Sequence, residues 1–307
     1  MVNNGTSCGA APNAASTRPS AGKLAFTIVV HKNPEQVIRL ASAVAASGNY
    51  CVIHCNARSG AAFRDAIERG LADAGIQSVR FLDSEPVAWG SGSILRVQMR
   101  AIDALLDWAD DWSHLVNLSG QCLPTKPLAE IERYLGTQQG QSFLECIDLD
   151  VERPDLAYRY SSYYVEVAGK VRKTFIPRFR PRGFRIFFGA FWVILSHEAC
   201  QYVTRSDEAH RIRRYLQYAM FPDELVFQTV LLNSPLKLKI VPDMKRLILW
   251  EGHSPNPKIL TLEQWPLIDA PDHLFARKFD HDHDAEVITR LGDRIGCNLA
   301  VGRLMNA

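Results

Sequence analysis

The sequence Pro222-Asp223-Glu224 is the most prominent acidic site in the 307-residue chain. The proline and the two acids precede an apolar run that reaches about residue 232, which is typical of a helix start. A helix N-terminus stabilises carboxylates, so a capped helix is the simplest interpretation. The alternative is that Glu224 is a general base held at the helix tip.

A basic pair, Arg277 and Lys278, lies between Phe275 and Phe279. Phenylalanines that anchor such a pair would hold both cations rigidly, as a diphosphate site requires. The alternative to a diphosphate site is a basic pair that points into solvent above a segment of the core.

Three other motifs carry weaker signals. The glycine-rich stretch 89–93 begins at Trp89, but it lacks the lysine of a phosphate-binding loop. An expected strand ends in Asp148-Leu149-Asp150, which looks like the Asp-x-Asp motif that binds a metal ion and a sugar donor. The alternating acids and histidines of 280–284 are either metal ligands or the N-cap of the helix that follows.

A basic segment at 172–185 contains six cations with phenylalanines between them. Such a pattern would grip an anionic acceptor or a nucleic acid, and a solvated basic loop is the simpler interpretation. The cations are Arg172, Lys173, Arg178, Arg180, Arg182 and Arg185.

The elements that must position these residues alternate between strand and helix up to residue 147, which predicts an α/β layer with a mainly parallel sheet. Ligands bind at the carboxyl ends of such strands, where His31, Asn56, Ser119 and Gly120 lie. Expected strands cover 24–30, 50–54, 78–82, 114–118 and 142–147; expected helices begin at Asn33-Pro34 and cover 63–74, 94–108 and 128–135.

The second half has a different pattern, with a polar hairpin over 158–173, a strand-like run at 184–195 and helices starting at Ser196 and Pro222. A closing helix is expected over 285–300. Because nothing marks a second linker, we expect a single domain over 23–307, after a disordered tail at 1–22 that is poor in apolar residues.

Composition excludes several classes of protein. With 47% hydrophobic residues and a net charge of +2, the chain is globular and gives no support to a whole-protein nucleic-acid or membrane-surface binder. Its longest uncharged apolar run, 186–195, is too short to span a membrane, and no signal peptide follows the start. Seven cysteines, an odd number, favour reduced thiols and a cytoplasmic protein.

Taken in order, several segments resemble the core-2/I-branching β-1,6-N-acetylglucosaminyltransferase and peptide O-xylosyltransferase family over about residues 24–290. The resemblance implies a glycosyltransferase-A fold, a UDP-sugar donor that carries N-acetylglucosamine or xylose, inversion at the anomeric carbon, and a glycan or protein acceptor. It implies a bacterial-type member without a membrane anchor, active in polysaccharide biosynthesis. The matching segments are 25–36, 89–93, 117–126, 222–224, 227–229, 246–250 and 274–280.

Individual roles follow from the resemblance. Glu224 falls on the family's catalytic base, Lys278 on the lysine that contacts the donor diphosphate, and Trp89 near the uridine. Asn56 stands where the family often has an aspartate that faces the base, and Arg246 or Lys258 is the candidate second cation. The donor-binding set is His31, Asn56, Trp89, Ser119, Gly120, Arg246, Lys258, Arg277 and Lys278, and the acceptor-binding set is Arg159, Asp223, Trp250 and Glu251.

The chemistry of inverting transfer needs one base to take the proton of the acceptor hydroxyl, and a metal or fixed cations to meet the charge on the departing diphosphate. Because the strand at 114–118 ends in Ser119-Gly120 without an acid, Arg277 and Lys278 are expected to replace a metal, and no cofactor is expected. The donor is assigned to 23–150 and the acceptor to 151–307. Two alternatives stay open: a polyanion or nucleic-acid binder that uses 172–185, and a metal-dependent hydrolase that uses 280–284.

Overall fold

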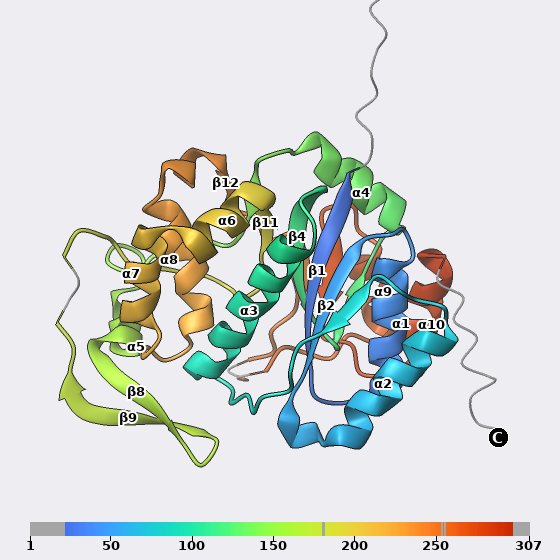
Figure 1. Ribbon diagram of the computed structural model, residues 1–307, viewed down its shortest axis with the longest axis horizontal. Coiled ribbons are helices and arrows are strands. Elements are labelled where there is room, and N and C mark those ends of the chain that lie inside the picture. The colour runs from blue at the N-terminus through green and yellow to red at the C-terminus, as the bar shows by residue number, and fades with distance from the viewer. Residues whose placement is uncertain (1–21, 180–181, 253, 255, 297–307) are drawn as a thin grey trace, which may run out of the picture.

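The computed structural model describes residues 22–179, 182–252, 254 and 256–296 as one mixed α/β domain with a central sheet between layers of helices (Figure 1). The tail expected at 1–22 lies outside the described residues, apart from Gly22. None of the helices in the described chain is long and apolar enough to cross a membrane.

The central sheet has seven strands in the order β12-β6-β11-β4-β1-β2-β3. As predicted, β1 pairs in parallel with β2 and β4, whereas β11 runs antiparallel to β4 and makes the sheet mixed. The strands are β1 (Lys23–Val30), β2 (Tyr50–Cys55), β3 (Val79–Phe81), β4 (Trp112–Ser119), β6 (Ser142–Phe143), β11 (Ile194–Ser196) and β12 (Ile240–Val241).

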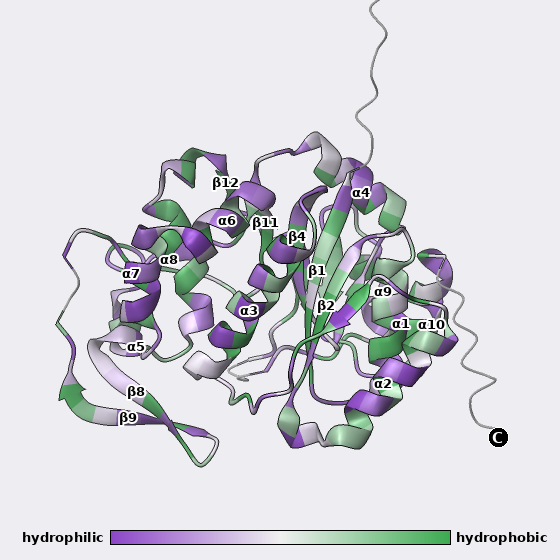
Figure 2. Ribbon diagram, viewed as in Figure 1, coloured by the Kyte–Doolittle hydropathy of each residue, from purple (hydrophilic) through white to green (hydrophobic). Residues whose placement is uncertain are grey.

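Two hydrophobic cores cover the two faces of this sheet. Alternate residues of β1, among them Phe26 and Ile28, join the core under α1, α2 and α10, while Ala25 joins the core under α3 and α6 to α8. Figure 2 shows the apolar residues of β1 in green between these layers. The helices are α1 (Pro34–Ala45), α2 (Ala61–Asp73), α3 (Gly92–Trp108), α4 (Leu128–Thr137), α5 (Tyr158–Ser161), α6 (His197–Arg205), α7 (Asp207–Leu216), α8 (Val226–Leu232), α9 (Trp265–Ile268) and α10 (Ala285–Arg294).

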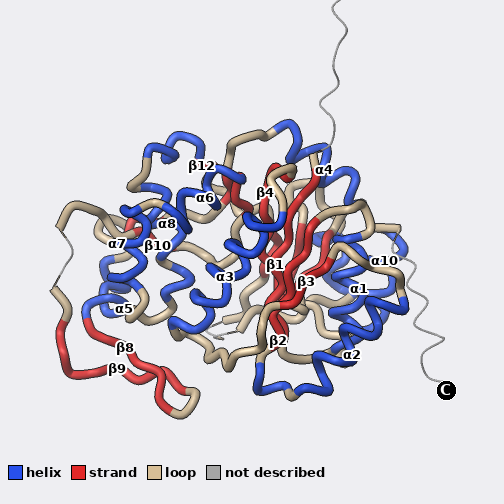
Figure 3. The backbone as a smooth tube through the Cα atoms, viewed as in Figure 1, coloured by secondary structure: helices blue, strands red, loops and turns tan. Residues whose placement is uncertain are grey.

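Smaller sheets lie outside the central sheet, and Figure 3 shows one of them, the β8–β9 hairpin, apart from it. One sheet has the order β13-β14-β5, β7 pairs with β10, and β8 and β9 form the predicted hairpin. These strands are β5 (Cys122–Pro124), β7 (Ile147–Asp148), β8 (Ser162–Val167), β9 (Lys170–Pro177), β10 (Phe187–Phe188), β13 (Arg246–Ile248) and β14 (Phe275–Arg277). The 3-10 turns are η1 (Ala57–Ser59), η2 (Pro154–Ala157), η3 (Pro222–Glu224), η4 (Pro235–Lys239) and η5 (Leu262–Gln264).

Two expected strands, 142–147 and 184–195, are each interrupted. Between their paired ends, the Ala190 N–H donates to Oε2 of Glu145 at 2.8 Å, and a side chain at Gly189 would collide with the Glu145 carbonyl. This close contact lies where both segments leave the central sheet. One end of each segment, β6 or β11, stays in the sheet, and the other ends, β7 and β10, pair with each other outside it.

The helix that the sequence predicts from Asn33-Pro34 begins there, with Asn33 as the N-cap residue and Pro34 as the first helical residue. Asn33 adopts a left-handed conformation with φ 55° and makes no capping hydrogen bond. Its side chain donates instead to Asp280 at 3.0 Å. The closing helix ends at Arg294 in the described residues, and the expected residues 297–300 lie outside them.

Candidate active site

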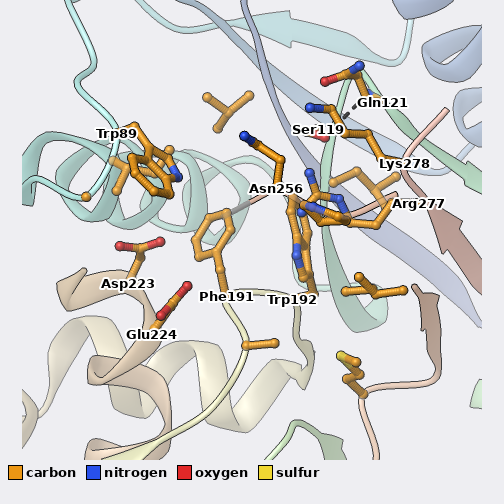
Figure 4. Close-up of a pocket in the computed structure, with 18 of the residues that line it drawn as sticks. Trp89, Ser119, Gln121, Phe191, Trp192, Asp223, Glu224, Asn256, Arg277 and Lys278 are labelled. Carbon is orange, nitrogen blue, oxygen red and sulfur yellow. Dashed lines mark hydrogen bonds between the residues drawn. The ribbon is translucent and has the colours of Figure 1, made fainter. Parts of the chain in front are cut away.

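A cavity of about 840 Å³ opens at the carboxyl ends of β1 and β4, between the central sheet and η3 (Figure 4). Its volume is in the range of pockets that hold a small organic ligand. The wall includes most of the predicted site residues: His31, Asn56, Trp89, Ser119, Asp223, Glu224, Trp250, Arg277 and Lys278.

One end of the cavity carries the basic pair, at the end of β14. Phe275 and Phe279 are fully buried on either side of the pair in the sequence, so the backbone that carries the pair is fixed to the core. The Arg277 guanidinium lies 4.0 Å from the centre of the Trp192 ring, and burial lowers its pKa. Burial lowers the pKa of Lys278 as well, and the neighbouring charges of Arg277 and Lys32 lower it further.

His31 and Lys32 reach the same end of the cavity from the end of β1. Burial lowers the pKa of His31, and the charges of Lys32 and Lys278 act in the same direction. Lys32 forms an ion pair with Asp280, which also accepts a hydrogen bond from the Gln121 side chain at 3.2 Å. We call the side chains of Arg277, Lys278, His31 and Lys32 the basic end.

The hydrolase alternative at 280–284 receives no support from the placement of its acids. Asp280 is held by Lys32 and Asn33, and Asp284 caps α10 by accepting the backbone N–H groups of Glu286 and Val287. Throughout the described chain, no three His, Cys, Asp or Glu side chains come together in a way that would bind a metal ion.

The opposite end of the cavity carries two carboxyl groups on η3. The backbone at Phe221 is left-handed, with φ 53°, and the turn that follows brings Asp223 and Glu224 to the cavity wall (Figure 4). Glu224 pairs with the Arg159 guanidinium, which lies over the Phe188 ring at 4.7 Å. Burial raises the pKa of Glu224, although the positive charge of Arg159 opposes this shift.

Asp223 is more isolated than Glu224. Its residue is only 8% exposed, and its Oδ1 atom has no hydrogen-bond partner among the described residues. Burial and the neighbouring Glu224 raise the pKa of Asp223 to about 8. Asp223 therefore carries a proton at neutral pH, whereas Glu224 has a cationic partner. We call these two groups the carboxyl end.

Two exposed tryptophans lie along the wall. Trp89 is 72% exposed and meets the edge of the Phe221 ring with 4.6 Å between ring centres, and Trp250 is 62% exposed. Asn56 is already engaged, because its Oδ1 accepts the Arg58 N–H at 3.1 Å and its Nδ2 donates to the Val87 carbonyl at 3.1 Å. Both polar atoms of Asn56 thus hold the backbone beside the cavity.

Two predicted donor residues, Gly120 and Arg246, lie behind the cavity wall instead of in it. A side chain at Gly120 would come within 2.9 Å of Val37, so this glycine permits close packing of β4 on α1. Arg246 is buried, donates to the Asn117 carbonyl at 3.1 Å and lies 5.0 Å from the Trp192 ring centre. These contacts make Arg246 a support for the Trp192 ring.

Three further predicted residues are also absent from the wall. Lys258 follows the wall residues Asn256 and Pro257, and its backbone N–H is bonded to Leu249 at 2.8 Å. Glu251 is exposed beside Trp250. Arg159, predicted to bind the acceptor, is instead the partner of Glu224.

Sequence reasoning missed several wall residues, among them Lys32, Gln121, Glu145, Trp192 and Asn256. Lys32 and Gln121 each lie two residues beyond the end of a strand, and the rule that pointed to His31 and Ser119 would have found them. The other three come from interrupted strands and loops, where no local pattern marks them.

The basic segment 172–185 does not form a single cationic face. Arg185 pairs with Asp148, the first acid of the proposed Asp-x-Asp motif. Arg178 lies between the rings of Tyr163 and Tyr215, with 4.9 and 4.1 Å from the guanidinium carbon to the ring centres. Arg180 falls outside the described residues. Two of the six cations that a polyanion would need are therefore already engaged in contacts within the protein.

Free thiols were expected, and the structure confirms them for the described cysteines. Cys51, Cys55, Cys122 and Cys200 are buried and free, and Cys146 is free and partly buried. Burial raises the pKa of the Cys55 and Cys146 thiols to about 11, so these groups are not nucleophiles at neutral pH.

Comparison with known proteins places this geometry in a family. The model of the Core-2/I-Branching enzyme family matches residues 24–267. Xylosyltransferase 2 of Homo sapiens is 28% identical over 293 residues, covering 87% of this chain and 33% of that protein. The corresponding protein of Mus musculus is 27% identical with the same coverage, and xylosyltransferase 1 of Rattus norvegicus is 24% identical over 307 residues, covering 92% and 37%.

The chain thus spans about a third of the length of these relatives. The family match runs from β1 to the middle of α9, and it includes η3 with both carboxyl groups. The fold is consistent with the glycosyltransferase-A type expected for such proteins. We conclude that the chain belongs to the Core-2/I-Branching enzyme family.

Proposed function

We propose that the protein is an inverting glycosyltransferase that transfers N-acetylglucosamine or xylose from a UDP-sugar to a hydroxyl group of a glycan or protein. The observation that supports this proposal is a single cavity with clustered cations at one end and a carboxyl pair at the other. Family membership supports the same reaction class.

The basic end suits the diphosphate of the donor. Burial lowers the pKa of Lys278 most, and the charges of Arg277 and Lys32 lower it further; a bound diphosphate would relieve that repulsion. When the bond between sugar and UDP breaks, negative charge grows on the phosphate oxygens, and cations already fixed in the cavity wall stabilise it. Arg277 is held over Trp192 and needs little rearrangement for this role.

The carboxyl end suits the acceptor. An acceptor hydroxyl oxygen attacks the anomeric carbon from the face opposite UDP, and the bonding electrons leave with UDP. Glu224 takes the hydroxyl proton in this step. A general base works best with a pKa near the working pH, and the raised pKa of Glu224 moves in that direction. Arg159 keeps the carboxylate ionised and fixes its orientation.

A thermal-shift screen of UDP-sugars tests this function directly. A ligand that binds only the folded state raises the unfolding midpoint. We expect UDP-N-acetylglucosamine or UDP-xylose to raise the midpoint, with UDP alone giving part of the shift and free sugar giving none. A screen in which no nucleotide sugar stabilises the protein would contradict the proposal.

We further propose that the reaction needs no metal ion, because Arg277 and Lys278 neutralise the diphosphate. The expected result is that sugar transfer proceeds at the same rate with and without excess EDTA. Loss of activity in EDTA, with recovery on adding manganese, would show that a metal shares this work.

A further inference from the structure

The β8–β9 hairpin has an inner face that is fixed to the domain. Its strand register sets Tyr164 opposite Lys173 and Glu166 opposite Val171, and opposite residues point to the same side of an antiparallel pair. Tyr164 is buried, and Glu166 accepts a hydrogen bond from Ser91 at 2.9 Å and pairs with Arg58 at 3.2 Å. These contacts determine which side of the hairpin faces solvent.

The outer face combines apolar and cationic side chains. The register sets Val165 opposite Arg172 and Val167 opposite Lys170, and both valines are exposed. At the end of β9, where the register with β8 shifts and no longer assigns side chains to one face, Phe175 is fully exposed and Ile176 is 62% exposed. Figure 2 shows the end of β9 in green, on a hairpin that projects from the body of the domain.

The positive charge on this face is not neutralised. Lys170 and Arg172 form no ion pair with any described residue. Glu166 is the one acid in the sequence 162–179, and Arg58 already occupies it. Although the whole chain is nearly neutral, the hairpin therefore presents local positive charge beside exposed apolar groups.

We propose that the outer face of the β8–β9 hairpin docks on an anionic lipid surface. Val165 and Val167 on this face, together with Phe175 and Ile176 at the exposed end of β9, would enter the boundary between head groups and acyl chains, while Lys170 and Arg172 would contact anionic head groups. An acidic polymer in solution would engage the cations but leave the apolar side chains in water. The combination of both kinds of group therefore favours a lipid surface.

Vesicle sedimentation with the full chain tests this docking. The probes are vesicles of phosphatidylcholine alone and vesicles that also contain phosphatidylglycerol, each at low and high salt. We expect binding to the anionic vesicles at low salt, weaker binding at high salt, and little binding to phosphatidylcholine. Failure to bind anionic vesicles at low salt would overturn the proposal.

Two double variants separate the apolar from the cationic contribution. Phe175→Ser with Ile176→Ser should weaken vesicle binding roughly tenfold or more. Lys170→Ser with Arg172→Ser should weaken it roughly tenfold to thirtyfold. Because these side chains point away from the core, both variants should unfold at the wild-type temperature.

A matched control lies on η4, where Leu238 is 90% exposed beside Lys237. Lys237→Ser with Leu238→Ser should leave vesicle binding unchanged. Equal loss in this control would overturn the assignment to the hairpin. Loss with the cation variant alone, while the apolar variant binds normally, would also overturn it and would favour an acidic polymer as the partner.

Discussion

The two ends of the cavity are built alike but with opposite charge. At the basic end Lys32 is paired with Asp280, while Lys278 has no ion-pair partner among the described residues. At the carboxyl end Glu224 is paired with Arg159, while Asp223 has no partner for Oδ1. Each end thus keeps a paired group in place and leaves at least one group facing the cavity without an ion-pair partner among the described residues.

The two ends differ in how each lowers the electrostatic cost of its buried charges. The Arg277 guanidinium keeps its charge at neutral pH, so the basic end is relieved when an anion binds. A buried carboxyl group can take up a proton, so the carboxyl end is relieved by protonation, as the pKa of about 8 at Asp223 shows. The basic end is therefore suited to binding an anion, and the carboxyl end is suited to proton transfer.

The largest effect is expected at the carboxyl end, for Glu224→Gln. Glutamine keeps the shape of the side chain but cannot take the hydroxyl proton, so turnover should fall roughly 10² to 10⁴-fold. Steady-state kinetics with saturating donor measure this change. Glu198→Gln, at an exposed ion pair with Lys239, is the matched control and should retain wild-type turnover. If Glu224→Gln also retained turnover, another carboxyl group would be the base.

A smaller effect is expected for Trp250→Ala at the cavity wall. The exposed indole offers a flat apolar face to a sugar ring, and its loss should raise the acceptor KM by roughly tenfold. Hydrolysis of the donor in the absence of acceptor is the internal control and should continue at the wild-type rate. Equal damage to transfer and to hydrolysis would instead give Trp250 a structural role.

The smallest effect is a pH-dependent change in stability for Asp223→Asn. Because its folded-state pKa is raised, Asp223 binds a proton in the folded protein that the unfolded chain has already released, so stability falls as pH rises from about 4 to 8. Asparagine does not titrate. The variant should therefore gain roughly 1–3 kcal/mol of unfolding free energy relative to wild type between about pH 5 and pH 9.

Urea unfolding at about pH 5 and pH 9 measures the difference in unfolding free energy between Asp223→Asn and wild type. Asp65→Asn, on the exposed side of α2, is the control. The control should follow the wild-type pH dependence. A gap for Asp223→Asn that stays constant with pH would mean that Asp223 is ionised in the folded protein.

Wall residues at the ends of predicted strands were the easiest part of the site to predict from sequence. His31 and Ser119 follow apolar strands, and the rule that ligands bind at the carboxyl ends of parallel strands locates them without further information. The continuous apolar run of β1 and the helical pattern of α3 were equally local, and both elements match the expected ranges to within two residues.

Long-range packing determined the rest of the site. Glu145 and Trp192 reach the wall because two expected strands leave the central sheet at the contact between Glu145 and Gly189. Arg246 and Arg277 both lie against Trp192, but only Arg277 lines the cavity. No sequence pattern distinguishes these two arginines, because their difference depends on the folded positions of the aromatic rings.

Calorimetric titration of UDP into Lys278→Ala and Glu224→Gln, in EDTA, tests the division between the two ends most directly. A charge-assisted contact to phosphate contributes roughly 1.5–3 kcal/mol, so Lys278→Ala should bind UDP about ten- to a hundredfold more weakly than wild type. Glu224→Gln should bind UDP as wild type does, and so should Lys258→Ala, since neither Lys258 nor the Glu224 carboxylate belongs to the basic end. Unchanged binding by Lys278→Ala, or UDP binding by wild type that disappears in EDTA, would contradict the account.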